Sequence, residues 1–123
     1  MVFTVNMATT QEVWDHHVTG FVARDVPTVL EDFTDGSVLV ANGELHRGRT
    51  EIGQFSEGLF VELPKDCSFD LSTCIVLEKH VYIVWNAESD SVVYEFAADT
   101  FAIEAGKITL QTIGYVKRNK SKG

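Results

Sequence analysis

The feature that most limits what this chain can form is its C-terminal half, which consists almost entirely of strand-forming segments. Runs rich in Val, Ile, Tyr, Phe and Thr cover residues 69–77, 80–86, 92–103 and 107–118, with only a few residues between one run and the next. Strands joined by such short connections pair with their sequence neighbours in antiparallel order. The second half of the chain therefore predicts an antiparallel sheet.

The N-terminal half has helical periodicity instead. Thr9 and Glu12 have the spacing of a capping box, and the apolar residues that follow recur every three or four positions until about Arg24. A second, short helix is predicted after Asp25, which can cap it, and its apolar edge extends to Phe33. We therefore expect two consecutive helices before the first strand.

A small hairpin and a third helix complete this half of the chain. Residues 37–47 predict two strands that meet at an Asn42-Gly43 turn, a pair of residues that favours tight hairpins. In residues 49–64 the apolar side chains recur with helical spacing, and Pro64 marks the end of the helix. Helices, a hairpin and then a long sheet are typical of the α+β class.

The segment 80–86 has apolar residues on both faces of its strand. Val81, Ile83 and Trp85 share one face, and Tyr82 and Val84 share the other. Helices can cover one face, and the sequence predicts no further helix for the other. We therefore expect a homodimer in which a second copy of the sheet covers the outer face. The alternative is a sheet that curves strongly enough to cover itself.

Length and charge exclude several classes of protein. At 123 residues the chain can form one domain with its own core, and its net charge of -8 disfavours binding to nucleic acid. No apolar run is long enough to cross a bilayer, and the first residues lack the features of a secretion signal, so we expect a cytoplasmic protein. The histidines lack the spacing of zinc ligands, and we expect neither a metal nor a cofactor.

One carboxylate interrupts the apolar run at residues 92–103. Asp99 shares a face with Ala97 and Phe101, so it is buried if that face packs against the helices and the alternation along the strand is unbroken. Burial would raise its pKa. On the first helix, His17 lies on the apolar stripe, so a second titratable group points inward. Two interpretations stay open: an acid and a histidine that converge on a functional cavity, or an exposed Asp99 and a structural His17.

Four stretches, taken in order, carry a family resemblance: FVARDVPTVLEDFTDGSVLV, HRGRTEIGQF, VYIVWN and DTFAIEAGKIT. Together they resemble the nuclear transport factor 2-like superfamily, in particular its polyketide cyclase (SnoaL-like) and ketosteroid isomerase branches, from about residue 10 to residue 116. The resemblance implies a cone-shaped, curved antiparallel (mixed) sheet wrapped around the N-terminal helices in a single domain. It also divides the chain into an N-terminal extension (1–8), a SnoaL-like cone domain (9–118) and a basic disordered tail (119–123).

The resemblance assigns roles to particular residues. Asp99 falls where the steroid isomerases keep a carboxylic acid that donates a hydrogen bond to an oxyanion, and His17 falls where they place a tyrosine donor. The position of their base corresponds to Ala41, which cannot accept a proton, so steroid isomerisation is not expected. The polyketide cyclases, which are thought to use one acid/base aspartate and a nearby histidine, resemble this arrangement better, with Asp99 as the acid/base and His17 assisting.

A hydrophobic ligand needs a lined pocket, for which the sequence offers aromatic and acidic candidates. The residues assigned to the pocket are Trp14, Phe21, Phe55, Tyr82, Trp85, Glu95, Phe101 and Tyr115. Two hypotheses follow. The first is a cofactor-independent isomerase, cyclase or lyase that acts on a small hydrophobic carbonyl compound by acid/base proton transfer. The second is a non-catalytic ligand-binding or dimerisation module of the same fold.

Overall fold

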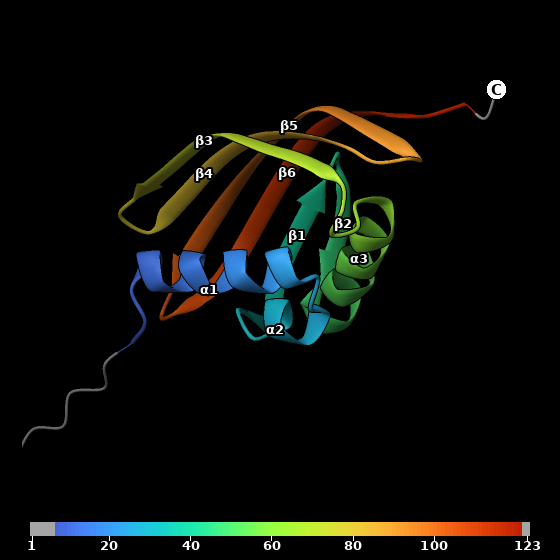
Figure 1. Cartoon of the computed structure of the whole chain (residues 1–123). Coiled ribbons are helices and arrows are strands. Elements are labelled where there is room, and N and C mark those ends of the chain that lie inside the picture. The colour runs from blue at the N-terminus through green and yellow to red at the C-terminus, as the bar shows by residue number, and fades with distance from the viewer. Residues whose placement is uncertain (1–6, 122–123) are drawn as a thin grey trace, which may run out of the picture.

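The computed structural model describes residues 7–121, and these form three helices and one sheet of six strands (Figure 1). The helices are α1 (Thr10–Ala23), α2 (Val26–Leu30) and α3 (Gly48–Glu62). The strands are β1 (Phe33–Ala41), β2 (Glu44–Arg47), β3 (Ser68–Leu77), β4 (His80–Glu88), β5 (Val92–Glu104) and β6 (Lys107–Asn119). This arrangement confirms the predicted α+β class and single domain.

Helix α1 begins and ends with well-defined local hydrogen bonds. At its start the Thr9 hydroxyl accepts a hydrogen bond from the Glu12 backbone at 3.1 Å, and the Glu12 carboxylate accepts one from the Thr9 backbone at 2.9 Å. This is the predicted capping box. At its end Arg24 adopts a left-handed conformation, with φ 55°, and its backbone N–H donates to the carbonyls of Gly20 and Phe21. These caps set the direction in which the chain enters α2.

Helix α2 is shorter than the sequence predicts. The sequence places Phe33 on the edge of this helix, whereas the helix ends at Leu30 and Phe33 begins β1. Phe33 pairs with Ile108 of β6, and the carbonyl of Asp32 accepts a hydrogen bond from the Ile108 backbone at 2.7 Å. The prediction for Phe33 is wrong because burial of this ring in the sheet, where it is 1% exposed, outweighs the local helical pattern. Asp32 thereby becomes the link between helix and strand.

The sheet has the order β2-β1-β6-β5-β4-β3, in which β1 and β6 are parallel and the other neighbours are antiparallel. The predicted turn between β1 and β2 is confirmed, since Asn42 and Gly43 have φ values of 46° and 87°. The Asn42 side chain donates to the backbone oxygen of Tyr115 at 3.1 Å and accepts from its backbone nitrogen at 2.9 Å. These bonds tie the hairpin to β6.

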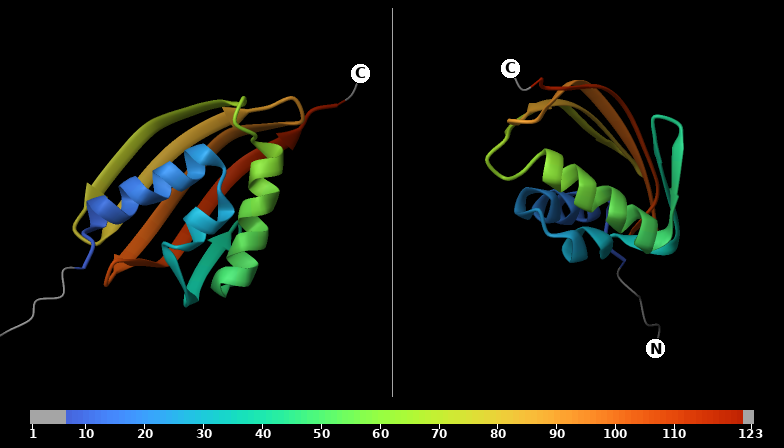
Figure 2. Two further views of the ribbon diagram at one scale, coloured as in Figure 1. Left: turned by 60° about the horizontal axis from the view of Figure 1, so that its bottom comes forward. Right: turned by 90° about the vertical axis from the view of Figure 1, so that its right-hand side faces the viewer.

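The sheet is curved and wraps around the helices (Figure 2). Register shifts interrupt the ladders between Leu71 and Thr73, between Trp85 and Ala87, and between Tyr94 and Phe96. Bulges of this kind bend a strand and increase its local twist. Because the shifts lie on β3, β4 and β5, they account for the bend of this part of the sheet over α1.

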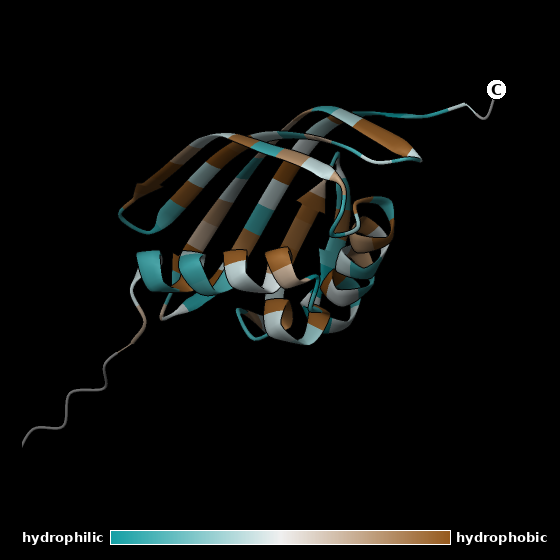
Figure 3. Ribbon diagram, in the orientation of Figure 1, coloured by the Kyte–Doolittle hydropathy of each residue, from teal (hydrophilic) through white to brown (hydrophobic). Residues whose placement is uncertain are grey.

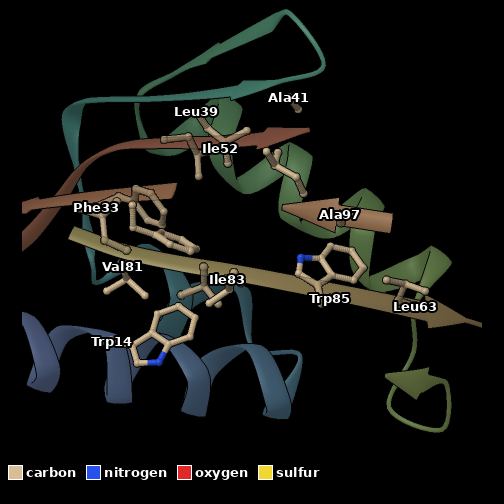
Figure 4. Packing of buried hydrophobic residues seen from close by; sticks show 14 of the residues in the cluster. Trp14, Phe33, Leu39, Ala41, Ile52, Leu63, Val81, Ile83, Trp85 and Ala97 are labelled. Carbon is tan, nitrogen blue, oxygen red and sulfur yellow. The ribbon is translucent and has the colours of Figure 1, made fainter. Parts of the chain in front are cut away.

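The concave face of the sheet packs against the helices. Apolar and polar residues alternate along several strands, as Figure 3 shows. Trp14 points from α1 toward Ile83 of β4 (Figure 4), and Ile52 of α3 is fully buried in the same core. Helices α1 and α3 therefore cover this face and enclose space between themselves and the sheet.

The convex face of the sheet is apolar and exposed. Tyr82, Phe96 and Val116 lie on the neighbouring strands β4, β5 and β6, and they are 40%, 49% and 56% exposed. Phe96 and Val116 are direct partners across the β5–β6 ladder. Curvature alone therefore does not cover this face within residues 7–121.

Candidate active site

A cavity of about 360 Å³ lies between α1, α3 and the concave face of the sheet. Most of its lining is apolar or aromatic. The buried polar side chains that line it are those of His17 on α1, Ser56 on α3, Asp99 on β5 and Gln111 on β6. A small molecule in this cavity would meet titratable groups that are shielded from bulk water.

Asp99 lines the cavity with both carboxylate oxygens already hydrogen bonded. Oδ1 accepts from the indole Nε1 of Trp85 at 2.8 Å, and Oδ2 accepts from Nε2 of Gln111 at 2.9 Å. Trp85 lies on β4 and Gln111 on β6, so the strands on both sides of β5 hold the carboxylate. Asp99 is 4% exposed, and the alternation predicted from Ala97 to Phe101 places it on the concave face.

Burial raises the pKa of Asp99 to about 6, because the charged form loses its hydration. The hydrogen bonds from Trp85 and Gln111, and the charge of His17, act in the opposite direction and favour the carboxylate. With this pKa, roughly nine tenths of the molecules carry an ionised Asp99 at pH 7. Such a carboxyl can accept and return a proton near neutral pH.

His17 brings an imidazole from α1 to the same cavity. It is buried among aromatic rings, with the ring centroids of Phe101, Trp14 and Phe33 at 5.2, 5.9 and 6.0 Å from its own. His17 also contributes to the electrostatic environment of Asp99. The two titratable residues singled out in the sequence therefore lie around one cavity.

A third titratable side chain near His17 is missed by the sequence analysis. Asp32 is buried, with Oδ2 3.6 Å from Nδ1 of His17 and Oδ1 2.7 Å from Nδ1 of His16. The sequence pattern extends α2 to Phe33, which puts Asp32 within a helix rather than at the start of a strand. No local pattern in the sequence marks its burial, which depends on the pairing of Phe33 with the distant strand β6.

Most residues predicted to line a ligand pocket lie around this cavity: Trp14, Phe21, Phe55, Trp85 and Phe101. Tyr82 and Tyr115 are placed elsewhere. Tyr82 points to the exposed convex face, and Tyr115 packs on Tyr94 with the ring centroids 5.4 Å apart. The cavity also has aromatic lining that the sequence analysis misses, from Phe60 of α3 and Phe69 of β3.

Glu95 does not line the cavity, because β5 is irregular at this point. Strict alternation puts Glu95 on the same face as Asp99, but the β5–β6 ladder shifts register between Tyr94 and Phe96. Glu95 is consequently turned to solvent, where its carboxylate accepts a hydrogen bond from Nε of Arg118 at 2.7 Å. The bulge corrects the sequence-based assignment of Glu95, which assumes an unbroken strand.

Two basic side chains, Arg24 and Lys65, also line the cavity. The Arg24 guanidinium donates to the carbonyl oxygens of Phe21 at 2.7 Å and Leu63 at 2.8 Å, and it stacks over the Phe21 ring. Among residues 7–121, neither Arg24 nor Lys65 forms an ion pair with an acidic side chain. They add two cationic side chains to a lining that is mostly apolar.

Two kinds of site are absent from the part of the chain that the structure describes. No group of three or more His, Cys, Asp or Glu side chains there is arranged to hold a metal ion. No helix there has the length and apolarity that a membrane span requires.

The family model of the SnoaL-like domain matches residues 14–111. No curated protein matches the chain. The fold is shared with solved structures, three of which are a candidate polyketide cyclase from Sinorhizobium meliloti, a candidate ketosteroid isomerase from Kribbella flavida and the epoxide hydrolase/cyclase-like enzyme SalBIII, which has a role in pyran ring formation in the polyether salinomycin.

The three structures agree with this chain in shape more than in sequence. For the cyclase candidate the TM-score is 0.67 at 13% identity, covering 82% of this chain and 92% of the other. For the isomerase candidate it is 0.71 at 11% identity, covering 95% and 86%. For SalBIII it is 0.72 at 17% identity, covering 87% and 90%. At these identities the likeness shows the fold.

Proposed function

This chain belongs to the SnoaL-like domain family, and we propose that it is a cofactor-independent isomerase, cyclase or lyase that transfers a proton on a small hydrophobic carbonyl compound. The observation that carries the proposal is Asp99, a buried carboxylate that lines an apolar cavity and has a pKa of about 6. A general base is most effective when its pKa lies close to the pH at which it works.

The cavity supports a hydrophobic ligand of modest size. Its volume of about 360 Å³ is within the range of roughly 300–1,000 Å³ found for small-molecule sites. Apolar side chains, many of them aromatic, supply most of the contact surface, and the few polar groups would fix the orientation of a carbonyl oxygen. Arg24 and Lys65 favour a compound that also carries an acidic group at one end.

Asp99 and His17 suit complementary steps. The Asp99 carboxylate would take a proton from the carbon next to the carbonyl, while the protonated imidazole of His17 gives a proton to the carbonyl oxygen, and the electron pair of the broken C–H bond forms the enol. Return of the proton from Asp99 to another carbon gives an isomer, as the enol hydroxyl gives its proton back to His17 and the carbonyl re-forms. Attack of the enol carbon on a second carbonyl closes a ring instead: the enol hydroxyl again returns its proton to His17, His17 passes that proton to the new alkoxide, and proton exchange with water restores ionised Asp99 and protonated His17. Asp99 thus takes the place of a base at residue 41.

The structural relatives suggest which substrates to test first. They include candidate cyclase and isomerase proteins and an enzyme with a role in pyran ring formation. Each of these names describes the activity of the protein that carries it. For this chain, the names make compounds that enolise or close rings the first substrates to test.

A second function is favoured by Ala41. It occupies the position at which the family resemblance puts the isomerase base, and it is a buried alanine outside the lining of the cavity. A ligand-binding or dimerisation module of the same fold needs no base, and it would use the cavity for binding only.

We also propose a homodimer formed through the convex face of the sheet. Among residues 7–121 no element covers this face, and its residues Tyr82, Phe96, Leu110 and Val116 are all exposed. A second copy of the same face would bury this apolar surface in an isologous contact.

We propose the cytoplasm as the compartment in which this dimer works. Both Cys67 and Cys74 are free. Reduced thiols are the rule in the cytosol, whereas oxidising compartments favour disulfides.

Deuterium incorporation tests the proposed function. The wild-type protein is incubated in D₂O with a panel of hydrophobic ketones and 1,3-diketones, with and without a carboxylate, and the carbon-bound deuterium is followed by NMR. We expect at least one compound to exchange with the wild type and to exchange 10²- to 10⁴-fold more slowly, on the order of a general base's contribution, with Asp99→Asn. Glu95→Gln, a carboxylate outside the cavity, is the matched control. Binding without Asp99-dependent exchange would favour the binding module.

A further inference from the structure

We propose that Asp32 is the positioning residue of this site, because its carboxylate keeps a proton on Nδ1 of His17 and leaves Nε2 as the nitrogen that exchanges a proton with the ligand. The proposal deepens the proposed function and depends on it for the chemical role of His17. Its structural content is independent of any substrate, since it concerns which nitrogen of one imidazole carries the proton.

The carboxylate of Asp32 lies next to the imidazole of His17. Asp32 links α2 to β1, and its Oδ2 lies 3.6 Å from Nδ1 of His17. Both atoms are buried, and neither has another hydrogen-bond partner among residues 7–121. The contact is longer than an ordinary N–H···O hydrogen bond. Each of the two atoms is nevertheless the potential hydrogen-bond partner of the other, and burying both without a partner would be costly. A proton on Nδ1 would point an N–H group at the carboxylate and so lower the cost of burying both atoms.

Asp32 is itself held in place by residues nearer the protein surface. Its other oxygen, Oδ1, lies 2.7 Å from Nδ1 of His16, and Nε2 of His16 lies 3.2 Å from Oε1 of Glu31. His16 is partly exposed and the Glu31 side chain is 66% exposed, so this chain of contacts leads from the protein surface to the buried carboxylate. Because His16 occupies Oδ1, Oδ2 is the oxygen left for His17.

Within residues 7–121, Nδ1 of His17 has no hydrogen-bond partner. Its ring neighbours are Trp14, Phe33 and Phe101, from α1, β1 and β5, and none offers a strong acceptor. The other charged groups near it are Asp99 on β5, which lines the same cavity, and the His16–Glu31 pair on the outer side of Asp32. Nδ1 therefore faces one carboxylate, and the cavity with Asp99 is left to Nε2.

This assignment determines what His17 does in the proposed reaction. With both nitrogens protonated, His17 gives the Nε2 proton to the carbonyl oxygen as Asp99 removes the proton from carbon. The imidazole that remains is neutral with its proton on Nδ1, and the Asp32 carboxylate is unchanged. When the oxygen returns the proton, it goes back to Nε2. The opposite neutral tautomer would have no lone pair on Nε2 to receive it.

NMR of the histidine ring nitrogens tests the assignment in the full chain. In ¹⁵N-labelled wild type, two-bond ¹H–¹⁵N correlations identify which nitrogen of neutral His17 carries the proton, and we expect it on Nδ1. Asp32→Asn and Asp32→Ala remove the carboxylate, and we expect both to lose the Nδ1–H preference. The matched control is Glu31→Gln, a neighbouring carboxylate that touches only His16; it should leave the His17 pattern unchanged.

Two results would overturn the proposal. One is a wild-type His17 whose neutral form carries its proton on Nε2, a measurement that needs no variant and so does not depend on how the variants fold. The other is an unchanged Nδ1–H pattern in a folded Asp32→Ala. These results are separable from failure of the proposed function. A protein with the expected tautomer and no deuterium exchange on any carbonyl compound would count against the proposed function alone. Asp99-dependent exchange in a protein with the Nε2–H tautomer would count against the role of Asp32 alone.

Discussion

The indole of Trp85 and the carboxylate of Asp99 meet diagonally across the β4–β5 pair, with Nε1 donating to Oδ1 at 2.8 Å. Asp99 lies opposite Ile83, and Trp85 follows two residues later on β4, so both side chains point to the concave face. Gln111 holds the second oxygen from the other side. The protonation of Asp99 is therefore controlled by both neighbouring strands of the sheet.

Removing the indole N–H should raise the pKa of Asp99 above its value of about 6. Trp85→Phe takes away one hydrogen bond that favours the carboxylate and keeps an aromatic ring to stack on Phe69 and Tyr94. A hydrogen bond to a charged group contributes about 1.5–3 kcal/mol. Its loss should therefore raise the pKa of Asp99 by about one to two. The pKa is measured from the ¹³C shift of the Asp99 carboxyl. An unchanged or lower pKa would contradict this account, and Tyr82→Phe on the convex face is the control.

Asp99 should make the stability of the wild type depend on pH between about 4 and 6. Its pKa is about 6 in the folded protein and 3.8 as its ordinary value, so in this window the folded state binds more protons than the unfolded state. The free energy of unfolding therefore falls as pH rises through the window, and it loses about 2 kcal/mol by pH 7 relative to pH 4. The Asn side chain of Asp99→Asn cannot titrate. Between pH 4 and pH 7 the free energy of unfolding of the wild type should therefore fall by this amount relative to that of the variant.

Denaturant unfolding of wild type and Asp99→Asn at pH 4 and pH 7 measures that difference. The contributions of titrating groups that do not interact with Asp99 are common to both proteins and cancel. If the stability difference between the two proteins were the same at both pH values, Asp99 would have to keep an ordinary pKa in the folded state.

The fold could be predicted because its elements follow from local patterns. The capping box at Thr9 and Glu12 sets the start of α1, and the Asn42-Gly43 pair sets the hairpin, whatever the rest of the chain does. The parallel pairing of β1 with β6 is different, because it joins segments about 70 residues apart, as in the pair Leu39 and Gln111. No local pattern records it.

The site could be predicted where regular alternation continues and not where tertiary pairing interrupts it. Asp99 lies in a regular part of β5, so its face follows from sequence spacing. Glu95 lies at the register shift of the same strand. Asp32 lies just after α2, which ends earlier than its sequence pattern predicts because Phe33 pairs with β6. Both events depend on a partner strand that is distant in sequence.

Charge on the convex face should dissociate the proposed dimer. Phe96→Asp places a carboxylate in the middle of the apolar surface, next to Val116, where a second copy would have to bury it unpaired. We expect sedimentation to show a dimer for the wild type and a folded monomer for the variant. Val61→Asp changes an exposed apolar residue on α3 and should leave the dimer intact. A wild-type protein that is monomeric at high concentration would rule out the dimer.

Close packing of α1 on α2 should make Gly20 intolerant of a methyl group. A Cβ at Gly20 would lie 3.1 Å from the backbone nitrogen of Val29, which cannot move without shifting α2, whereas a Cβ at Gly58 of α3 would meet nothing within 4 Å. Gly→Ala gains about 1 kcal/mol of helix propensity at either position, so this contribution is common to both variants. The free energy of unfolding of Gly20→Ala should therefore be lower than that of Gly58→Ala by about 1–3 kcal/mol, the usual cost of overpacking. Because α2 leads directly into Asp32, a shift of α2 should also disturb the Nδ1 signal of His17, which Gly58→Ala should leave in place. Equal stability of the two variants would mean that the two helices separate at little cost.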